Sequence, residues 1–204
     1  YSPQSLVADA RRHGVTTLRA DVMFSQVEAS LEGPALNSGF DSCLDREQAP
    51  VGPFEPSPDL PERLNEHRRD AHLEVRLGLL GVKGIGRADA ERIVQLREEQ
   101  PFSSLADLKR RSGLGASQIE ALAQAGAFDS LGLQRREALW LAGFADSEDV
   151  LPQTLPSEQA PVLPAMDEVA ELHADLSSTG ITAERHPFSL VRDSLDDRGV
   201  LSVA

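Results

Sequence analysis

One short segment, residues 80–93, constrains the fold of this chain more than any other, because two closely spaced glycines stand directly before an apolar-periodic helix. The glycines are Gly84 and Gly86. A residue without a Cβ adopts the backbone of a tight turn and leaves no side chain between main-chain N–H groups and an anion. The helix that follows offers N–H groups at its positive end, which favour a phosphate oxygen. The segment therefore predicts a phosphate-binding turn.

The residues around this turn support that interpretation. Lys83 and Arg87 flank it with positive charge, and Ile85 stands between its glycines. The following helix carries one face at helical spacing, made of Ala90, Ile93, Val94 and Arg97. This is the pattern of a helix-hairpin-helix motif.

Two other interpretations of the glycines remain open. A dinucleotide-binding fold requires a βαβ unit, whereas here the glycines read G-x-G-x-x-x-A and one strand-like segment, residues 73–79, precedes them. Alternatively, the glycines only turn the chain between two packed elements. A simple turn, however, needs a single glycine and no flanking cations.

A degenerate second copy of the motif follows at residues 112–122. Gly113 and Gly115 precede a helix whose apolar residues are Ile119, Leu122 and Ala123. Two such hairpins can touch phosphates on both strands of a duplex. This copy has no cation at its turn, and the positive run Lys109, Arg110 and Arg111 could serve it. The same run is equally consistent with a solvated helix end, since cations are favoured there by the helix dipole.

The charge of the chain is unevenly distributed. The whole chain has a net charge of −13. Residues 76–145 carry ten basic and eight acidic side chains, whereas residues 1–75 carry seven and thirteen, and residues 146–204 carry three and twelve. The middle is thus the one part that phosphate would not repel. An acidic surround also fits a module that acts within a larger assembly.

Several classes of protein are disfavoured by the composition. No run approaches the roughly 20 apolar residues of a membrane span, and no secretory leader is present, so we expect a cytoplasmic protein without a membrane partner. Cys43 has no neighbouring His to activate it, and His67 and His72 lack further metal ligands at suitable spacing. We therefore expect no metal site. The start at Tyr1 suggests an excised piece of a longer chain.

The pattern of caps and breakers predicts a mainly α-helical protein with a small β element. A first helix begins with Ser2 and Pro3 and stops at Gly14. Extended segments at 15–22 and 26–32, the second alternating in apolar residues, should pair with 73–79. Further helices are predicted at 87–99, 105–111, 117–125, 134–142, 166–176 and 187–198.

Two proline-rich linkers, residues 33–61 and 146–164, divide these elements. We expect three parts: 1–75 with the sheet and a long loop, 76–145 with the tandem helix-hairpin-helix domain, and 146–204 with a linker and tail helices. The tail helices should pack through apolar residues that face inward: Val169, Leu172 and Leu176 in the first, and Phe188, Val191 and Leu195 in the second.

Five sequence blocks together resemble the C-family bacterial DNA polymerases. They are YSPQSLVADARRHGV (1–15), EVRLGLLGVKGIG (74–86), FSSLADLKRR (102–111), AGAFDSLGLQRREALW (125–140) and STGITAERHPFSLVR (178–192). The region of resemblance is the end of the fingers, the tandem helix-hairpin-helix domain and the approach to the OB domain. Within the family, the blocks resemble the error-prone, damage-tolerant branch more than the replicative alpha subunit.

The resemblance implies a function for the hairpins. In this family they hold double-stranded DNA behind the active site, a role that passes by position to Lys83, Gly84, Ile85, Gly86 and Arg87. It also implies a possible monovalent cation at the hairpin and magnesium for the parent polymerase, whose paired carboxylates have no counterpart here. Other proteins of a mutagenesis or replication complex are expected partners. The rival hypothesis is a protein-docking module in which the hairpins are only structural.

Overall fold

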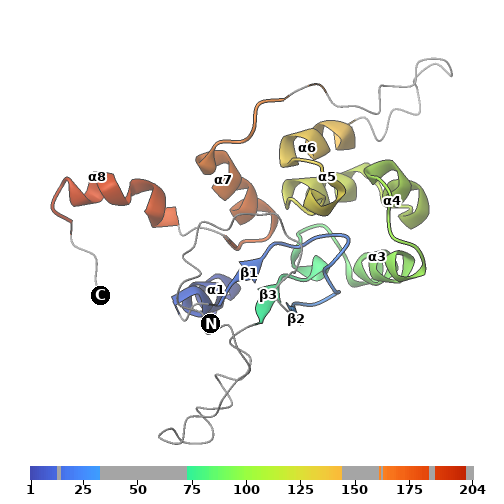
Figure 1. Cartoon of the computed structure of the whole chain (residues 1–204), viewed down its shortest axis with the longest axis horizontal. Helices are drawn as coiled ribbons and strands as arrows, with labels where there is room; N and C mark the ends of the chain where they lie inside the picture. The colour runs from blue at the N-terminus through green and yellow to red at the C-terminus, as the bar shows by residue number, and fades with distance from the viewer. Residues whose placement is uncertain (13–14, 33–72, 144–160, 162, 184–186, 201–204) are drawn as a thin grey trace, which may run out of the picture.

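Figure 1 shows the computed structural model of the chain, which describes residues 1–12, 15–32, 73–143, 161, 163–183 and 187–200. Helices predominate in these residues and accompany one small sheet, which confirms the predicted fold class. The predicted linkers, 33–61 and 146–164, lie wholly or largely outside the described residues, as do Cys43, His67 and His72. In the described part of the chain, no helix has both the length and the hydropathy needed to cross a bilayer.

The first helix, α1 (Pro3–Arg12), begins where the sequence predicts. The N–H of Ser5 donates to Ser2 Oγ at 3.2 Å. Ser2 therefore satisfies one of the N-terminal donors that have no acceptor within the helix. The predicted stop at Gly14 lies outside the described residues.

The sheet has three short strands, β1 (Thr17–Leu18), β2 (Ser30–Glu32) and β3 (Glu74–Arg76), in the order β1-β3-β2. β1 runs parallel to β3, and β2 runs antiparallel to it. The predicted pairing of the two early segments with residues 73–79 is confirmed. The strands are shorter than predicted, and Leu31 of β2 does not face the core, since it is 59% exposed.

A turn at Asp21 ends the first extended segment early. The N–H of Met23 donates to Asp21 Oδ1 at 2.7 Å, and the N–H of Ser25 donates to the Asp21 carbonyl at 2.8 Å. An Asp side chain that accepts an N–H two residues later stabilises a turn in competition with strand pairing. The same carboxylate accepts the N–H and the hydroxyl of Ser130, at 3.1 and 2.6 Å. Asp21 thus connects this turn to the helical half.

The helical half follows the sheet. Its elements are η2 (Leu79–Gly81), α3 (Arg87–Glu99), α4 (Leu105–Ser112), α5 (Ala116–Gln124), η3 (Asp129–Leu131) and α6 (Arg135–Gly143). The four α-helices begin and end within one residue of the predicted bounds. The reason is local: Ser104 Oγ accepts the N–H of Asp107 at 3.1 Å at the start of α4, and Gly113 and Gly126 take positive φ after α4 and α5.

The core lies between these helices and the segment that joins β1 to β2. Its largest fully buried side chains are Leu79, Ile93, Leu108, Ile119, Leu122 and Phe128. Ala20 and Val22 belong to the same cluster and are 1% and 0% exposed. Ala20 and Val22 therefore share a core with the described residues of the predicted middle part, from Leu79 to Ala142.

Arg97 lies on the core-facing side of α3, as the spacing of that helix indicates, although it is charged. It is 9% exposed, and its Nη1 donates to the carbonyls of Val22 at 3.0 Å and Ser25 at 2.8 Å. Burial lowers the pKa of Arg97 from its ordinary value. Its hydrogen bonds fix α3 to the turn at Asp21.

The tail consists of α7 (Glu168–Ser178), η4 (Pro187–Val191) and α8 (Arg192–Asp196). The prediction that apolar tail residues face inward is wrong for most of them. Val169 and Phe188 are each 64% exposed, Val191 is 45% exposed and Leu176 is 38% exposed. In Figure 1, α8 stands apart from the other helices, whereas α7 lies beside α5 and α6.

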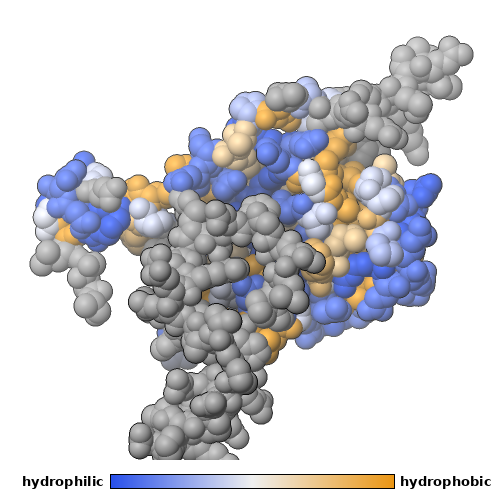
Figure 2. All heavy atoms as spheres, viewed as in Figure 1, coloured by the Kyte–Doolittle hydropathy of each residue, from blue (hydrophilic) through white to orange (hydrophobic). Residues whose placement is uncertain are grey.

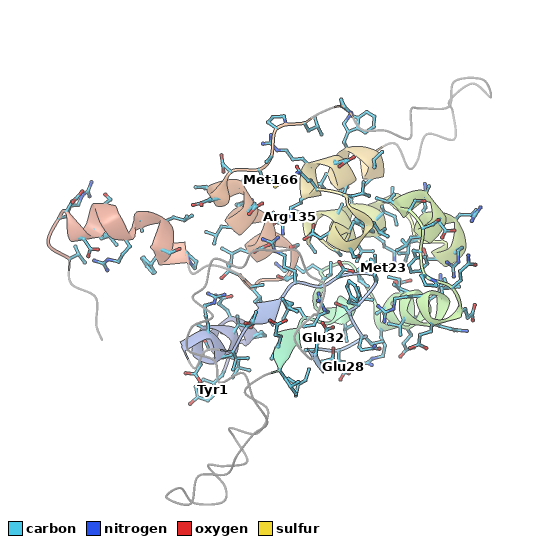
Figure 3. All side chains as sticks on the ribbon, in the orientation of Figure 1. Tyr1, Met23, Glu28, Glu32, Arg135 and Met166 are labelled. Atoms are coloured by element: carbon cyan, nitrogen blue, oxygen red, sulfur yellow. The ribbon has the colours of Figure 1, made fainter. Side chains whose placement is uncertain are left out.

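Polar contacts hold α7 in place. Arg135 of α6 reaches toward α7 (Figure 3), where its Nη2 donates to Asp175 Oδ1 at 2.6 Å and its Nη1 donates to the Glu171 carbonyl at 3.0 Å. Arg135 and Asp175 are 6% and 7% exposed. After α7, the backbone N–H of Thr182 donates to Gln4 Oε1 at 2.9 Å, which ties the chain to α1. Apolar periodicity could not reveal this mode of attachment.

Candidate nucleic-acid interface

Two turns with the same backbone precede α3 and α5. We call residues 82–86 the first hairpin and residues 111–115 the second hairpin. Gly84 and Gly113 have φ of +94° and +64°, a region that favours glycine. Gly86 and Gly115 are the N-cap residues, with extended backbones at φ −82°, ψ 165° and φ −74°, ψ 166°. The predicted second copy of the motif therefore exists in the fold.

The residue between the two glycines is buried in each hairpin. Ile85 and Leu114 are 5% and 3% exposed. Their side chains anchor the hairpins in the core, so the surface of each hairpin is mainly main chain. The Ile85 side chain, predicted to lie at the phosphate site, is therefore not accessible, and its N–H donates to the Val82 carbonyl at 3.1 Å.

The two hairpins pack reciprocally. A Cβ built on Gly84 would lie 3.6 Å from Ala121 Cβ in α5, and one built on Gly113 would lie 4.0 Å from Arg92 Nη1 in α3. The sequence offset between the glycines is also the offset between Arg92 and Ala121. Each hairpin thus abuts the helix of the other, as a pseudo-twofold arrangement requires.

A side-chain bridge joins the starts of α3 and α5. Asp89 Oδ2 accepts the N–H of Gly86 at 3.3 Å and the Nε2 of Gln118 at 2.7 Å. Gln118 Oε1 accepts the N–H of Gly115 at 2.9 Å. These bonds form one continuous chain from Gly86 to Gly115, which we call the hairpin bridge. Neither Asp89 nor Gln118 stood out in the sequence, because their partners are set by the packing of α3 against α5.

Lys83, predicted as a phosphate ligand, contacts α7 in this structure. Its backbone N–H donates to the Ser178 carbonyl at 2.8 Å. Its Nζ donates to the carbonyls of Ser177 at 2.8 Å and Leu176 at 3.3 Å. The last carbonyls of a helix lack intrahelical donors and lie at its negative end, so Lys83 acts as a cap of α7.

Arg87, the other predicted cation of the first hairpin, is paired with carboxylates. Its Nη2 lies 2.7 Å from Glu28 Oε1 (Figure 3 labels Glu28), and its Nη1 lies 4.0 Å from Glu91 Oε1. The hydrogen bond that Arg87 donates to Glu28, together with the negative charge of that carboxylate, raises the pKa of Arg87. Both cations at the first hairpin therefore already contact electronegative groups of the protein.

The basic run before the second hairpin divides between different contacts. Arg111 donates to the Leu96 carbonyl at 2.5 Å and lies 4.8 Å over the ring of Phe102, so it caps α3. Arg110 lies 2.7 Å from Asp107 and its side chain is 77% exposed, while Lys109 is half-buried. Of this run, Arg110 is the cation most available to an external anion.

Arg92 supplies the cation that the sequence did not place at the second hairpin. Its Nη1 donates to the Ser112 carbonyl at 2.8 Å, next to Gly113, and the residue is exposed. Only the fold brings Arg92 to this turn, because it lies on α3, twenty residues before Ser112. The N3 position of α5 is also neutral Gln118, whereas that of α3 is Asp89. The surroundings of the second hairpin are therefore less negative than those of the first.

Figure 2 shows hydrophilic residues along the edge of the molecule formed by α3 and α4. Among the described residues, no group of three His, Cys, Asp or Glu side chains is arranged to hold a metal ion. This region offers the positive ends of α3 and α5 and the exposed guanidinium groups of Arg92 and Arg110, which suit phosphate oxygens.

A pH-dependent contribution to stability is expected from Asp107. The N–H of Ser103, together with Arg110 and Arg111, lowers the pKa of this carboxyl below its usual range. Stabilisation by Asp107 should be present above about pH 4 and lost as pH falls through the lowered folded pKa. Asp107→Asn should therefore lower the Tm at pH 7 and lower it less at pH 3. A Tm difference independent of pH would contradict this expectation.

Comparison with known proteins agrees with this geometry. The model of the family described as "Helix-hairpin-helix motif" matches residues 14–138. The chain belongs to the helix-hairpin-helix family. The match begins before the sheet and includes both hairpins, in agreement with the core that these segments share.

Relatives of this helix-hairpin-helix chain are named error-prone DNA polymerases, which confirms the resemblance drawn from the five sequence blocks. The chain is 45% identical over 217 residues to the protein of Cutibacterium acnes, covering 100% of this chain and 19% of that protein. For the proteins of Mycolicibacterium paratuberculosis and Corynebacterium jeikeium the identity is 42% over 207 residues, covering 100% and 97% of this chain and 16% of each relative. The chain thus spans less than a fifth of the relatives it matches.

Proposed function

We propose that this chain binds double-stranded DNA through its two hairpins, without reading the base sequence, as part of an error-prone DNA polymerase in damage-induced translesion synthesis. The observation that carries this proposal is the pair of hairpins with matching backbones, joined at their N-caps by the hairpin bridge. It places the N-termini of α3 and α5 side by side.

The composition of the hairpin surfaces supports binding that is independent of sequence. The side chains of Ile85 and Leu114 are buried, so the positive ends of α3 and α5 and the exposed cations remain to meet the DNA. Such groups bind phosphate oxygens, which position a duplex but carry no base information. Arg92 and Arg110 add positive charge at the second hairpin.

The polymerase context rests on the relatives. Because those proteins are named error-prone DNA polymerases, we infer that the duplex is the primer–template product of such an enzyme in the bacterial cytoplasm. Nucleotidyl transfer and its magnesium ions would belong to the longer protein. A monovalent cation at the hairpins and protein partners in a mutagenesis or replication complex stay predictions.

Loss of Arg92 should weaken duplex binding. We expect Arg92→Gln to reduce affinity by about tenfold, because a charge-assisted hydrogen bond to phosphate is lost. The slope of log K against log salt is negative, and its magnitude should decrease by about 1. Both quantities can be measured by fluorescence anisotropy of a labelled duplex at several salt concentrations.

The matched control is Arg198→Gln, since Arg198 is an exposed arginine two residues after α8, the helix that stands apart from α3 and α5 in Figure 1. It should leave the salt slope unchanged. The two variants have the same net charge, so a difference between them reports the position of the arginine. Equal binding by both, with Arg92→Gln folded by circular dichroism, would remove Arg92 from the interface.

A specific observation also favours the rival function, a protein-docking module. Lys83 and Arg87 of the first hairpin are held by α7 and Glu28, so this hairpin already serves as a docking structure within the chain. Salt separates the two functions. Phosphate contacts weaken steeply as salt rises because counterions are released, whereas an apolar docking surface is much less sensitive.

A further inference from the structure

We propose that Asp89 and Gln118 are positioning residues that fix the separation and orientation of the two hairpins, so that both engage one duplex at the same time. The inference rests on the proposed function. This inference goes beyond that function by assigning a role to two side chains that need not touch the DNA themselves.

The hydrogen bonds of the hairpin bridge have a fixed direction. An ionised Asp89 can only accept, so Gln118 must present its Nε2 to it at 2.7 Å. This leaves Gln118 Oε1 to accept the N–H of Gly115 at 2.9 Å. Reversing the amide would set two acceptors against each other at Asp89 and two donors against each other at Gly115. One rotamer of Gln118 therefore satisfies both ends.

The bridge has two separable functions. The contacts of Asp89 with Gly86 and of Gln118 with Gly115 each cap one helix within its own motif. Of the three bonds of the hairpin bridge, the one between Asp89 and Gln118 connects the two motifs. That bond is charge-assisted and therefore stronger than a neutral one. A change that breaks it and keeps both caps isolates the positioning function.

Fixed spacing matters because the two hairpins act as linked binding modules. When two sites are held at the separation of their targets, binding at the second site becomes intramolecular and the combined affinity exceeds that of either site. Loss of the fixed geometry removes this gain even if each hairpin stays intact. A defect in the hairpin bridge should therefore weaken duplex binding and reduce the number of phosphates that the chain contacts.

Gln118→Glu is the variant that breaks the bond between the motifs. A Glu at this position can still accept the N–H of Gly115, but it places a second carboxylate against Asp89. We expect about tenfold weaker duplex binding by the 204-residue chain and a salt slope lower by about 1. The Tm should also fall, because two like charges then face each other.

The double variant Asp89→Asn with Gln118→Glu should restore binding. Its Asn carbonyl can accept the N–H of Gly86, and its Asn amide can donate to the new Glu, so the chain of bonds is rebuilt with the charge moved. This variant has the same net charge as the parent.

Asp89→Asn alone keeps an acceptor for Gln118 and should also bind within about twofold of the parent or more tightly, since a carboxylate is removed.

The outcomes separate this inference from the proposed function. Recovery of affinity and of salt slope in the double variant supports positioning. If Gln118→Glu lowers only the Tm while affinity and slope match the parent, the bridge is merely structural and the inference is wrong, although DNA binding stands. If the parent shows no salt-dependent binding of duplex, the proposed function fails, and the positioning role fails with it.

Discussion

Replacing Arg135 by methionine is expected to destabilise the protein by about 3 kcal/mol, among the largest effects of a single change in the described residues. The substitution removes the guanidinium 2.6 Å from Asp175 Oδ1 and leaves a buried carboxylate without its main partner. Arg19, whose Nε lies 3.6 Å from the same oxygen, compensates in part. For that reason we place the effect at the lower end of the range for broken buried ion pairs.

The matched control is Arg136→Met. Arg136 is the next residue of α6, and its Nη1 donates to the Pro164 carbonyl at 3.2 Å near the surface. This change should alter the free energy of unfolding by less than about 0.5 kcal/mol. Urea denaturation of both variants measures the difference. If both lose the same stability, the buried pair does not hold α7.

A second variant tests the physical cause. Arg135→Met combined with Asp175→Leu removes both charges and should regain much of the lost stability, because an apolar pair has no desolvation penalty. If the double variant is as unstable as the single one, the loss comes from packing around Arg135 and not from the uncompensated charge.

Gly78→Ala is expected to cost about 3 kcal/mol or more, although Gly78 has an ordinary backbone with φ −77°. A Cβ at this position would lie 2.3 Å from the carbonyl carbon of Glu28 and 2.6 Å from the Val27 oxygen. These are backbone atoms, and the Leu80 N–H fixes them by donating to Val27 O at 3.0 Å. Relief therefore requires moving the chain, which places the cost at the upper end of that for overpacking.

Gly81→Ala is the control, since Gly78 and Gly81 lie at opposite ends of one short helix, η2: Gly78 is its N-cap residue and Gly81 its last residue. A Cβ there would meet no atom within 4 Å. Because the unfolded chain loses conformational freedom, the expected result is neutral or slightly stabilising, by up to about 1 kcal/mol. Thermal melts of the two variants should move in opposite directions or differ by many degrees. Similar melts would show that the contact with Glu28 relaxes easily.

The local features of the fold could be predicted from the sequence. Helix bounds followed from caps and glycines such as Ser104 and Gly113, whose effects act within one turn. The two hairpins followed from glycine spacing. The positive φ of Gly84 agrees with the tight turn expected there. The sequence could not show, however, that Gly78 is required for the close approach of Glu28, since that requirement depends on a segment far away in the sequence.

The polar contacts of the site were less predictable. The neighbours of Lys83 in the sequence suggested a free cation, but its partners lie at the end of α7, more than ninety residues away. Arg92 reached the second hairpin through packing alone. In the tail, an apolar residue was wrongly predicted to be buried. The apolar spacing in α7 indicated an apolar face, but it carried no information about what covers Val169.

The cap that Lys83 forms on α7 changes how variation among relatives should be read. A lysine retained at this position across species would be expected from the capping of α7 alone, because its ammonium meets the carbonyls of Leu176 and Ser177. Evolutionary constancy here is therefore no evidence for a DNA contact. A more informative comparison pairs position 83 with the length and end of α7: relatives in which that helix ends earlier should be free to vary the lysine unless a phosphate also needs it.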